Sequence, residues 1–128
     1  MIIEIISGLQ ICSIDDSFDK SIYDKYSIDI ILNCSIDMPF VDIQNVNKIR
    51  LPLKNMLSLK SNLDKILNFI KDNYLKKNIL IVSNEDYNIV ICALFLIKFG
   101  DISVVDIKNI MKMKHDKLSI DRNLNEFL

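Results

Sequence analysis

Glycine is scarce in this sequence, which has only Gly8 and Gly100 among its 128 residues. Loops that hold nucleotide phosphates need several glycines, because only a backbone without side chains can approach the phosphates closely. The two glycines here lie in different parts of the chain. The Walker loop and the dinucleotide-binding fingerprint are therefore excluded.

Side chains that bind metal ions are also few. His115 is the only histidine, and Cys12, Cys34 and Cys92 are far apart, without the paired spacing of zinc ligands. We therefore expect no metal site and no cofactor. Cys92 lies in an apolar segment beside Ala93, where we expect a buried core thiol.

Neither sign of charge dominates the sequence. Sixteen basic residues against seventeen acidic ones give a formal net charge of -1. Proteins that bind the phosphate backbone of nucleic acids usually carry a basic face or tail, and this chain has neither. Nucleic acid is therefore not expected as a partner.

Long hydrophobic runs are missing. The longest apolar stretch, residues 89–97, is much shorter than the roughly 20 residues needed to cross a bilayer. The N-terminus is apolar but contains Glu4 and has no basic start, so we expect neither a signal peptide nor a membrane partner. Isoleucine is abundant, whereas alanine occurs once and arginine twice, a bias typical of an AT-rich genome such as that of a large DNA virus or a protozoan. We expect an intracellular, cytoplasmic protein, in the virion or the host cytoplasm if the source is viral.

Half of the residues are hydrophobic, enough to bury a core, and the length suits one domain over residues 1–128. Apolar runs bounded by polar turns predict strands, and apolar residues at three- and four-residue steps predict helices. The expected strands are 2–6, 9–11, 28–34, 48–53 and 78–82. The expected helices are 18–26, after capping side chains at 15–17, then 57–74, 87–99 and 103–114, with 118–128 closing the domain. This order predicts an α/β domain with a central, mostly parallel sheet flanked by helices.

Three segments carry a resemblance to a known family. Residues 6–13 read ISGLQICS and resemble the family opening "I-x-x-G-L-Y-I-G-S". Residues 28–34 are similar to the "I-T-H-I-L-N" strand, and residues 49–53 to the "Y-x-x-I-P-L" strand. In order and wording the chain resembles, over nearly its whole length, the dual-specificity branch of the protein tyrosine phosphatases. The resemblance implies a protein tyrosine phosphatase-like fold.

The resemblance also implies where the catalytic groups would lie. Family members use a His-Cys-x5-Arg loop, in which a thiolate attacks phosphate and an arginine clamps it. Counted from the preceding strand, the histidine falls on Val82, the cysteine on Ser83 and the arginine on Ile89. Counted back from the following helix, the cysteine falls on Ile81 and the arginine on Tyr87, so the loop is shortened. The degenerate phosphate-loop positions are therefore Val82, Ser83, Asn84, Glu85, Asp86, Tyr87 and Ile89.

The other catalytic parts are replaced as well. The family's general acid, an aspartate, falls on Asn55, whose amide cannot protonate a leaving group. Glu85 and Asp86 stand where phosphate would bind, and there they repel it, mimic it or simply cap the following helix. No loop glycine is present, and nothing in the sequence spacing brings Arg50 or Arg122 to the loop.

We therefore expect a catalytically inactive pseudophosphatase that acts as an interaction, scaffolding or structural module, with a protein partner or as a homodimer. One alternative is a domain that binds phosphoproteins without hydrolysis, which would need an arginine from Arg50, Arg122 or a second subunit. The other is a residual hydrolase using Ser83, Asp86 or Cys92, although serine needs an adjacent base and the sequence suggests none.

Overall fold

The computed structural model describes all residues from 1 to 128 and is built on one five-stranded sheet with the order β1-β2-β5-β3-β4. The strands are β1 (Ile3–Ile6), β2 (Leu9–Cys12), β3 (Ile28–Asn33), β4 (Asn47–Arg50) and β5 (Asn78–Val82). Only β1 runs antiparallel to its neighbour; β2, β5, β3 and β4 are parallel. The expected α/β class with a mostly parallel sheet is confirmed.

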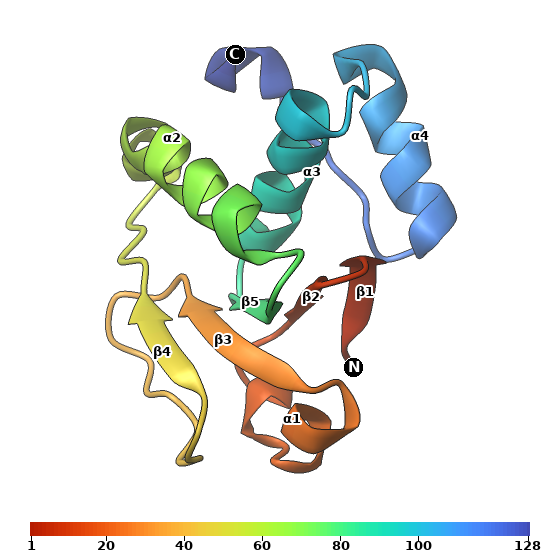
Figure 1. Cartoon of the computed structure of the whole chain (residues 1–128). Coiled ribbons are helices and arrows are strands. Elements are labelled where there is room, and N and C mark those ends of the chain that lie inside the picture. The colour runs from red at the N-terminus through yellow and green to blue at the C-terminus, as the bar shows by residue number, and fades with distance from the viewer.

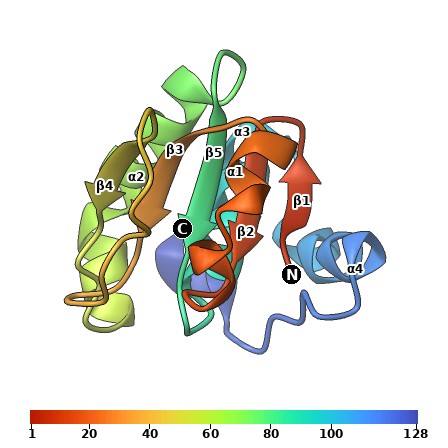
Figure 2. The same ribbon diagram turned by 90° about the horizontal axis from the view of Figure 1, so that it is seen from below.

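Helices cover both faces of this sheet, as Figures 1 and 2 show. On one face lie α2 (Met56–Asn73), α3 (Tyr87–Phe99), α4 (Val104–Lys114) and the 3-10 turn η2 (Leu124–Phe127). The other face carries η1 (Asp16–Phe18) and the short helix α1 (Ser21–Lys25). The hydrophobic core is divided accordingly into 27 buried residues on the α2–α4 side and eight on the α1 side.

The position of the central helix α3 explains why its sequence is apolar on all sides. It lies between α2 and α4, above the sheet (Figure 1), and nearly every residue from Tyr87 to Leu96 is buried. A helix enclosed on all sides needs no polar face, whereas α2 is buried only through a stripe of leucines and isoleucines. The expected bounds of both helices are confirmed to within one residue.

Two expected elements differ from the structure. The single helix expected at 18–26 is wrong, because Asp19 adopts an extended backbone between η1 and α1, and its carboxylate accepts hydrogen bonds from the Ser21 backbone and hydroxyl. The strand expected at 48–53 ends at Arg50, shortly before Pro52. Proline cannot donate to a ladder, which accounts for the early end.

None of the helices has both the length and the apolar character that a membrane crossing requires.

Candidate functional site

The candidate site is the loop of residues 83–86 between β5 and α3, the segment that the sequence analysis singled out. It follows the carboxyl end of β5, which lies in the middle of the sheet between β2 and β3. In open parallel sheets, ligands bind beyond the carboxyl ends of the strands. The fold therefore places this loop where ligand chemistry would be sought.

The Ser83 hydroxyl forms hydrogen bonds with the loop and with the start of α3. Its hydroxyl donates to the Glu85 carbonyl at 2.7 Å and accepts from the Asn88 amide at 3.2 Å, and the residue is buried. The one histidine of the chain lies elsewhere, and the Nδ1 atom of His115 accepts from the Lys117 amide at 3.0 Å. Neither contact of the Ser83 hydroxyl provides a base, so the hydroxyl serves to shape the loop.

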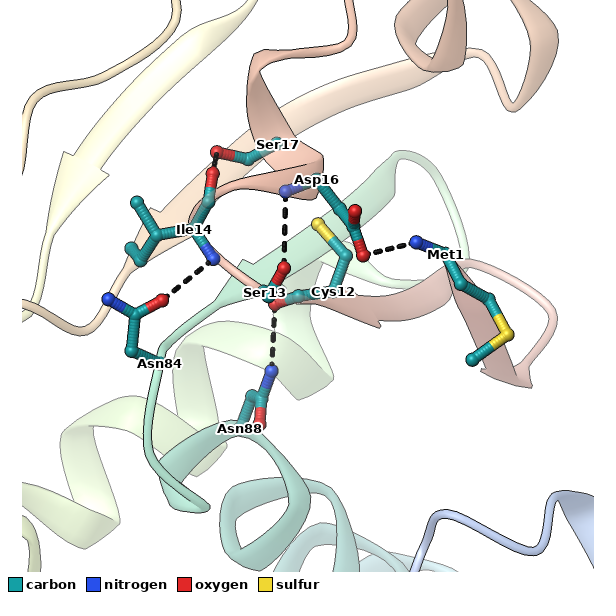
Figure 3. Close-up of polar contacts among 8 residues, drawn as sticks. All are labelled: Met1, Cys12, Ser13, Ile14, Asp16, Ser17, Asn84 and Asn88. Carbon is teal, nitrogen blue, oxygen red and sulfur yellow. Dashed lines mark hydrogen bonds and ion pairs between the residues drawn. The ribbon is translucent and has the colours of Figure 1, made fainter.

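Two asparagines fasten the loop to the end of β2 (Figure 3). The Asn88 side-chain amide donates to the Cys12 carbonyl at 3.0 Å and to the Ile81 carbonyl at 3.4 Å. Asn84 accepts from the Ile14 amide at 3.3 Å. Asn84 was among the predicted loop positions, whereas Asn88 was not; the signal for Asn88 is a single amide within an otherwise apolar helical run. The Asn88 side chain is buried, and both its nitrogen and its oxygen form hydrogen bonds. It therefore fixes the position of α3 relative to β2.

Asp86 pairs with Arg122, so the fold brings to the loop an arginine whose place there the sequence spacing did not indicate. The guanidinium donates twice to the carboxylate, from Nε at 2.7 Å and from a terminal nitrogen at 3.1 Å. Asp86 makes no side-chain cap on α3, so the simple capping interpretation is wrong. The hydrogen bond to Asp86 raises the pKa of Arg122. Arg50 stays away from the loop and donates to the carbonyls of Ser35 and Met38.

The pairing of Asp86 with Arg122 can be tested by a double-mutant cycle. The side chains of Arg122 and Asp86 are 43% and 34% exposed, so we expect Arg122→Gln and Asp86→Asn each to lower the free energy of unfolding by about 0.5–1 kcal/mol. The double variant should cost clearly less than the sum, because each single change removes the same interaction. Urea unfolding of the four proteins at low and high salt measures this coupling. Strict additivity at low salt would contradict a formed pair.

The remaining loop positions are divided between core and surface. Val82 is buried in the α1-side core, and Tyr87 is buried at the start of α3, where burial and then the charge of Glu85 raise its pKa. Glu85 is exposed. It contributes to two clefts that flank the loop, one of about 570 Å³ that Ile89 also lines, and one of about 230 Å³.

Asn55, the expected general-acid position, is a helix cap. Its side chain accepts from the Ser58 amide at 2.9 Å, and the Ser58 hydroxyl accepts from the Asn55 amide at 3.1 Å, a reciprocal capping box at the start of α2. The smaller cleft is lined by Lys54 and not by Asn55. Besides Glu85, the acidic residue in that cleft is Asp37, which was not among the predicted site residues.

The cysteines offer no reactive thiolate. Burial raises the pKa of Cys34 to about 12, and burial with the charge of Asp16 raises that of Cys12 to about 12. Cys92 is fully buried in α3, as expected, and its pKa is also raised. Near Cys12, the N-terminal ammonium binds Asp16 (Figure 3) and lowers the pKa of that carboxyl. A thiol with a raised pKa is a poor nucleophile at neutral pH.

Comparison with known proteins shows similarity in fold rather than in sequence. No family model matches the sequence, and no curated protein matches it. Among solved structures, DUSP15 superposes with a TM-score of 0.82 at 16% identity, covering 98% of this chain and 82% of that one. Human DUSP28 gives 0.81 at 12% identity, covering 98% and 91%. The human tyrosine phosphatase-like serine/threonine/tyrosine-interacting protein gives 0.77 at 14% identity, covering 98% and 90%.

Proposed function

Since the chain has the fold of the dual-specificity phosphatases, we propose that it is a pseudophosphatase, a protein-interaction module that does not hydrolyse phosphoesters. The observation that carries the proposal is the loop between β5 and α3. Its four residues, Ser-Asn-Glu-Asp, include neither a cysteine nor an arginine. A phosphatase of this fold needs a thiolate and a guanidinium there.

The contacts of the loop support the same proposal. The Ser83 hydroxyl and the Asp86 carboxylate are engaged within the protein, so neither is offered to a substrate. Asn55 caps α2, and its amide is not acidic enough to protonate a leaving group. Glu85 adds a negative charge to the lining of both flanking clefts, which disfavours a phosphate dianion.

If the protein does not act on phosphoesters, its role is expected to be the binding of a protein partner. The fold is intact, with 41 of its 128 residues buried, while the groups for chemistry are replaced. A stable fold without its chemistry can still present surfaces. One similar structure is named a phosphatase-like interacting protein, which offers a parallel for such a role without fixing the partner.

The proposal predicts the result of a turnover assay. Wild-type protein and Ser83→Cys are both expected to release no phosphate above background from p-nitrophenyl phosphate or from peptides carrying phosphotyrosine or phosphothreonine. A thiol alone restores nothing, because the arginine clamp and the acid remain absent. An active dual-specificity phosphatase and its Cys→Ser variant serve as controls. Turnover by the wild type that follows protein concentration and survives repurification would overturn the proposal.

Phosphoprotein binding without hydrolysis is a second candidate, and the position of Arg122 favours it. This guanidinium lies at the loop and would be free to clamp phosphate if Asp86 released it. Thermal shift with tungstate and with phosphotyrosine tests the point. Stabilisation of the wild type, by about 2.7 kcal/mol at a ligand concentration 100 times Kd, would support this candidate. Stabilisation of Asp86→Asn alone would show that the carboxylate blocks the anion.

A further inference from the structure

The strand β4 forms an open edge of the sheet. Its only neighbour is β3, and the Leu51 amide donates to the Asn33 carbonyl at 2.8 Å. Residues of a parallel strand direct their N–H and C=O groups to alternate sides. The backbone N–H and C=O groups of Ile49 and Leu51 therefore point to β3, while those of Lys48 and Arg50 point outward, away from the sheet. An open row of this kind is a template for another strand.

An apolar cavity opens beside this edge, between β4 and α2. Both elements lie at the same side of the molecule in Figures 1 and 2. The cavity measures about 210 Å³ and its lining is five apolar side chains and one lysine: Leu32, Ile49, Leu51, Lys65, Ile66 and Phe69. Pockets for drug-sized ligands are larger, about 300–1,000 Å³. This cavity instead fits one large apolar side chain.

Lys65 supplies the one charge of the cavity. Its side chain is exposed on α2, and it forms no ion pair within the chain. Lys48 adds a second exposed positive charge on the edge strand itself. Ile49, Leu51 and Phe69 are only partly buried, so the apolar wall is open to solvent. An occupant that complements this surface is apolar at one position and acidic close by.

We infer that β4 and the adjoining cavity form a docking site for an extended, acidic segment of a partner protein. The segment adds a sixth strand to β4, inserts one large apolar side chain into the cavity, and pairs a carboxylate with Lys65. Side chains on one face of a strand are two residues apart, so the segment carries an aromatic or branched residue and an acid at that spacing. This inference rests on the proposed function and names the surface through which it operates.

The peptide acetyl-TTVTFTETT-amide and its reversed sequence are suitable probes, because the added strand can run in either direction. Binding is measured by fluorescence anisotropy of labelled peptide, and its location by amide hydrogen exchange of the full chain. The expected Kd is micromolar for one of the two peptides. Exchange of the Lys48 and Arg50 amides should slow on binding, because their N–H groups are then paired.

Three variants separate this site from other contacts. Lys65→Glu should weaken binding by about fivefold to tenfold, and a peptide with lysine in place of glutamate should restore it. Lys60→Glu, on the same helix but outside the cavity, is the matched control. Lys48→Pro removes an outward N–H and should abolish binding, while Lys48→Ala keeps that N–H and should retain most of it.

Several results would overturn the inference: no binding of either peptide, protection of amides elsewhere than β4 and α2, or equal effects of Lys65→Glu and Lys60→Glu. Loss of binding by Lys48→Pro supports the inference only if urea unfolding shows that this variant is folded. If it is unfolded, the comparison of Lys65→Glu with Lys60→Glu provides the test. If the peptides do not bind, the docking site is refuted, but the proposal that the protein lacks phosphatase activity is unaffected. Phosphatase activity in the assay above would instead refute the proposed function.

Discussion

Above pH 9, the free energy of unfolding is expected to fall by about 4 kcal/mol per pH unit. The cause is the three buried thiols, whose pKa values in the folded state are raised from the ordinary value near 9. For Cys12 and Cys34 the folded value is about 12. Unfolding at pH 10 therefore releases about three protons, and rising pH favours the unfolded chain.

The direction of this effect follows from which state holds the protons. Below about pH 8 the thiols are protonated in both states, so their contribution to stability is fully present and independent of pH. Between pH 9 and about 12 only the unfolded chain ionises, and stability is lost across that window. Tyr23, whose pKa is also raised by burial, adds to the loss at the upper end. A domain stable by about 5–15 kcal/mol should unfold before pH 12.

Urea unfolding at a series of pH values measures the slope. In Cys34→Ala, one of the three thiols is absent, so the slope should become shallower by about 1.4 kcal/mol per pH unit, even though the small cavity lowers stability throughout. Parallel slopes for this variant and the wild type would contradict the thiol explanation. Labelling with a thiol reagent at pH 8 should also be slow until urea unfolds the chain.

Gly8→Ala is the second change with a large expected effect. Gly8 has a φ of +91° in the turn between β1 and β2, a conformation that other residues rarely adopt. An added Cβ would lie 2.1 Å from the Tyr74 carbonyl oxygen, which is backbone and cannot rotate away. We expect a loss of about 3–5 kcal/mol in the free energy of unfolding, from strain and overpacking together.

Ser7→Ala is the matched control, because Ser7 lies in the same turn and is exposed. It should change the free energy of unfolding by less than about 0.5 kcal/mol. Chemical denaturation of both variants, with circular dichroism as the probe, provides the comparison. A Gly8→Ala protein as stable as the control would mean that the turn can move away from the end of α2.

Much of this fold could be predicted because its signals are local. The strand of residues 78–82 and the start of α3 at Tyr87 follow from an apolar run, a polar turn and a second apolar run. The Ser103 cap of α4 was visible for the same reason, and its side chain accepts from the Asp106 amide. The first helix was predicted wrongly because an aspartate side chain can hydrogen-bond to nearby backbone and interrupt a helix, as Asp19 does between η1 and α1.

The contacts of the candidate site could be predicted only in part. The role of Ser83 in the turn could be predicted, because its hydroxyl bonds only to nearby residues, Glu85 and Asn88. The Asp86–Arg122 pair joins residues 36 positions apart, and the bond from Asn88 to the Cys12 carbonyl spans 76 positions. Periodicity carries no information about such pairs, because the folded path of the chain decides them.

The central place of β5 has a consequence for how the chain folds during synthesis. Its residues pair with β2 on one side and β3 on the other, so Leu9 meets Ile79 and Ile31 meets Leu80. Until residue 82 has left the ribosome, β2 and β3 therefore have no strand between them. Contacts of such long sequence separation form slowly, and the waiting strands are open to association with other chains. Chaperone demand during translation should therefore be greatest just before β5 emerges.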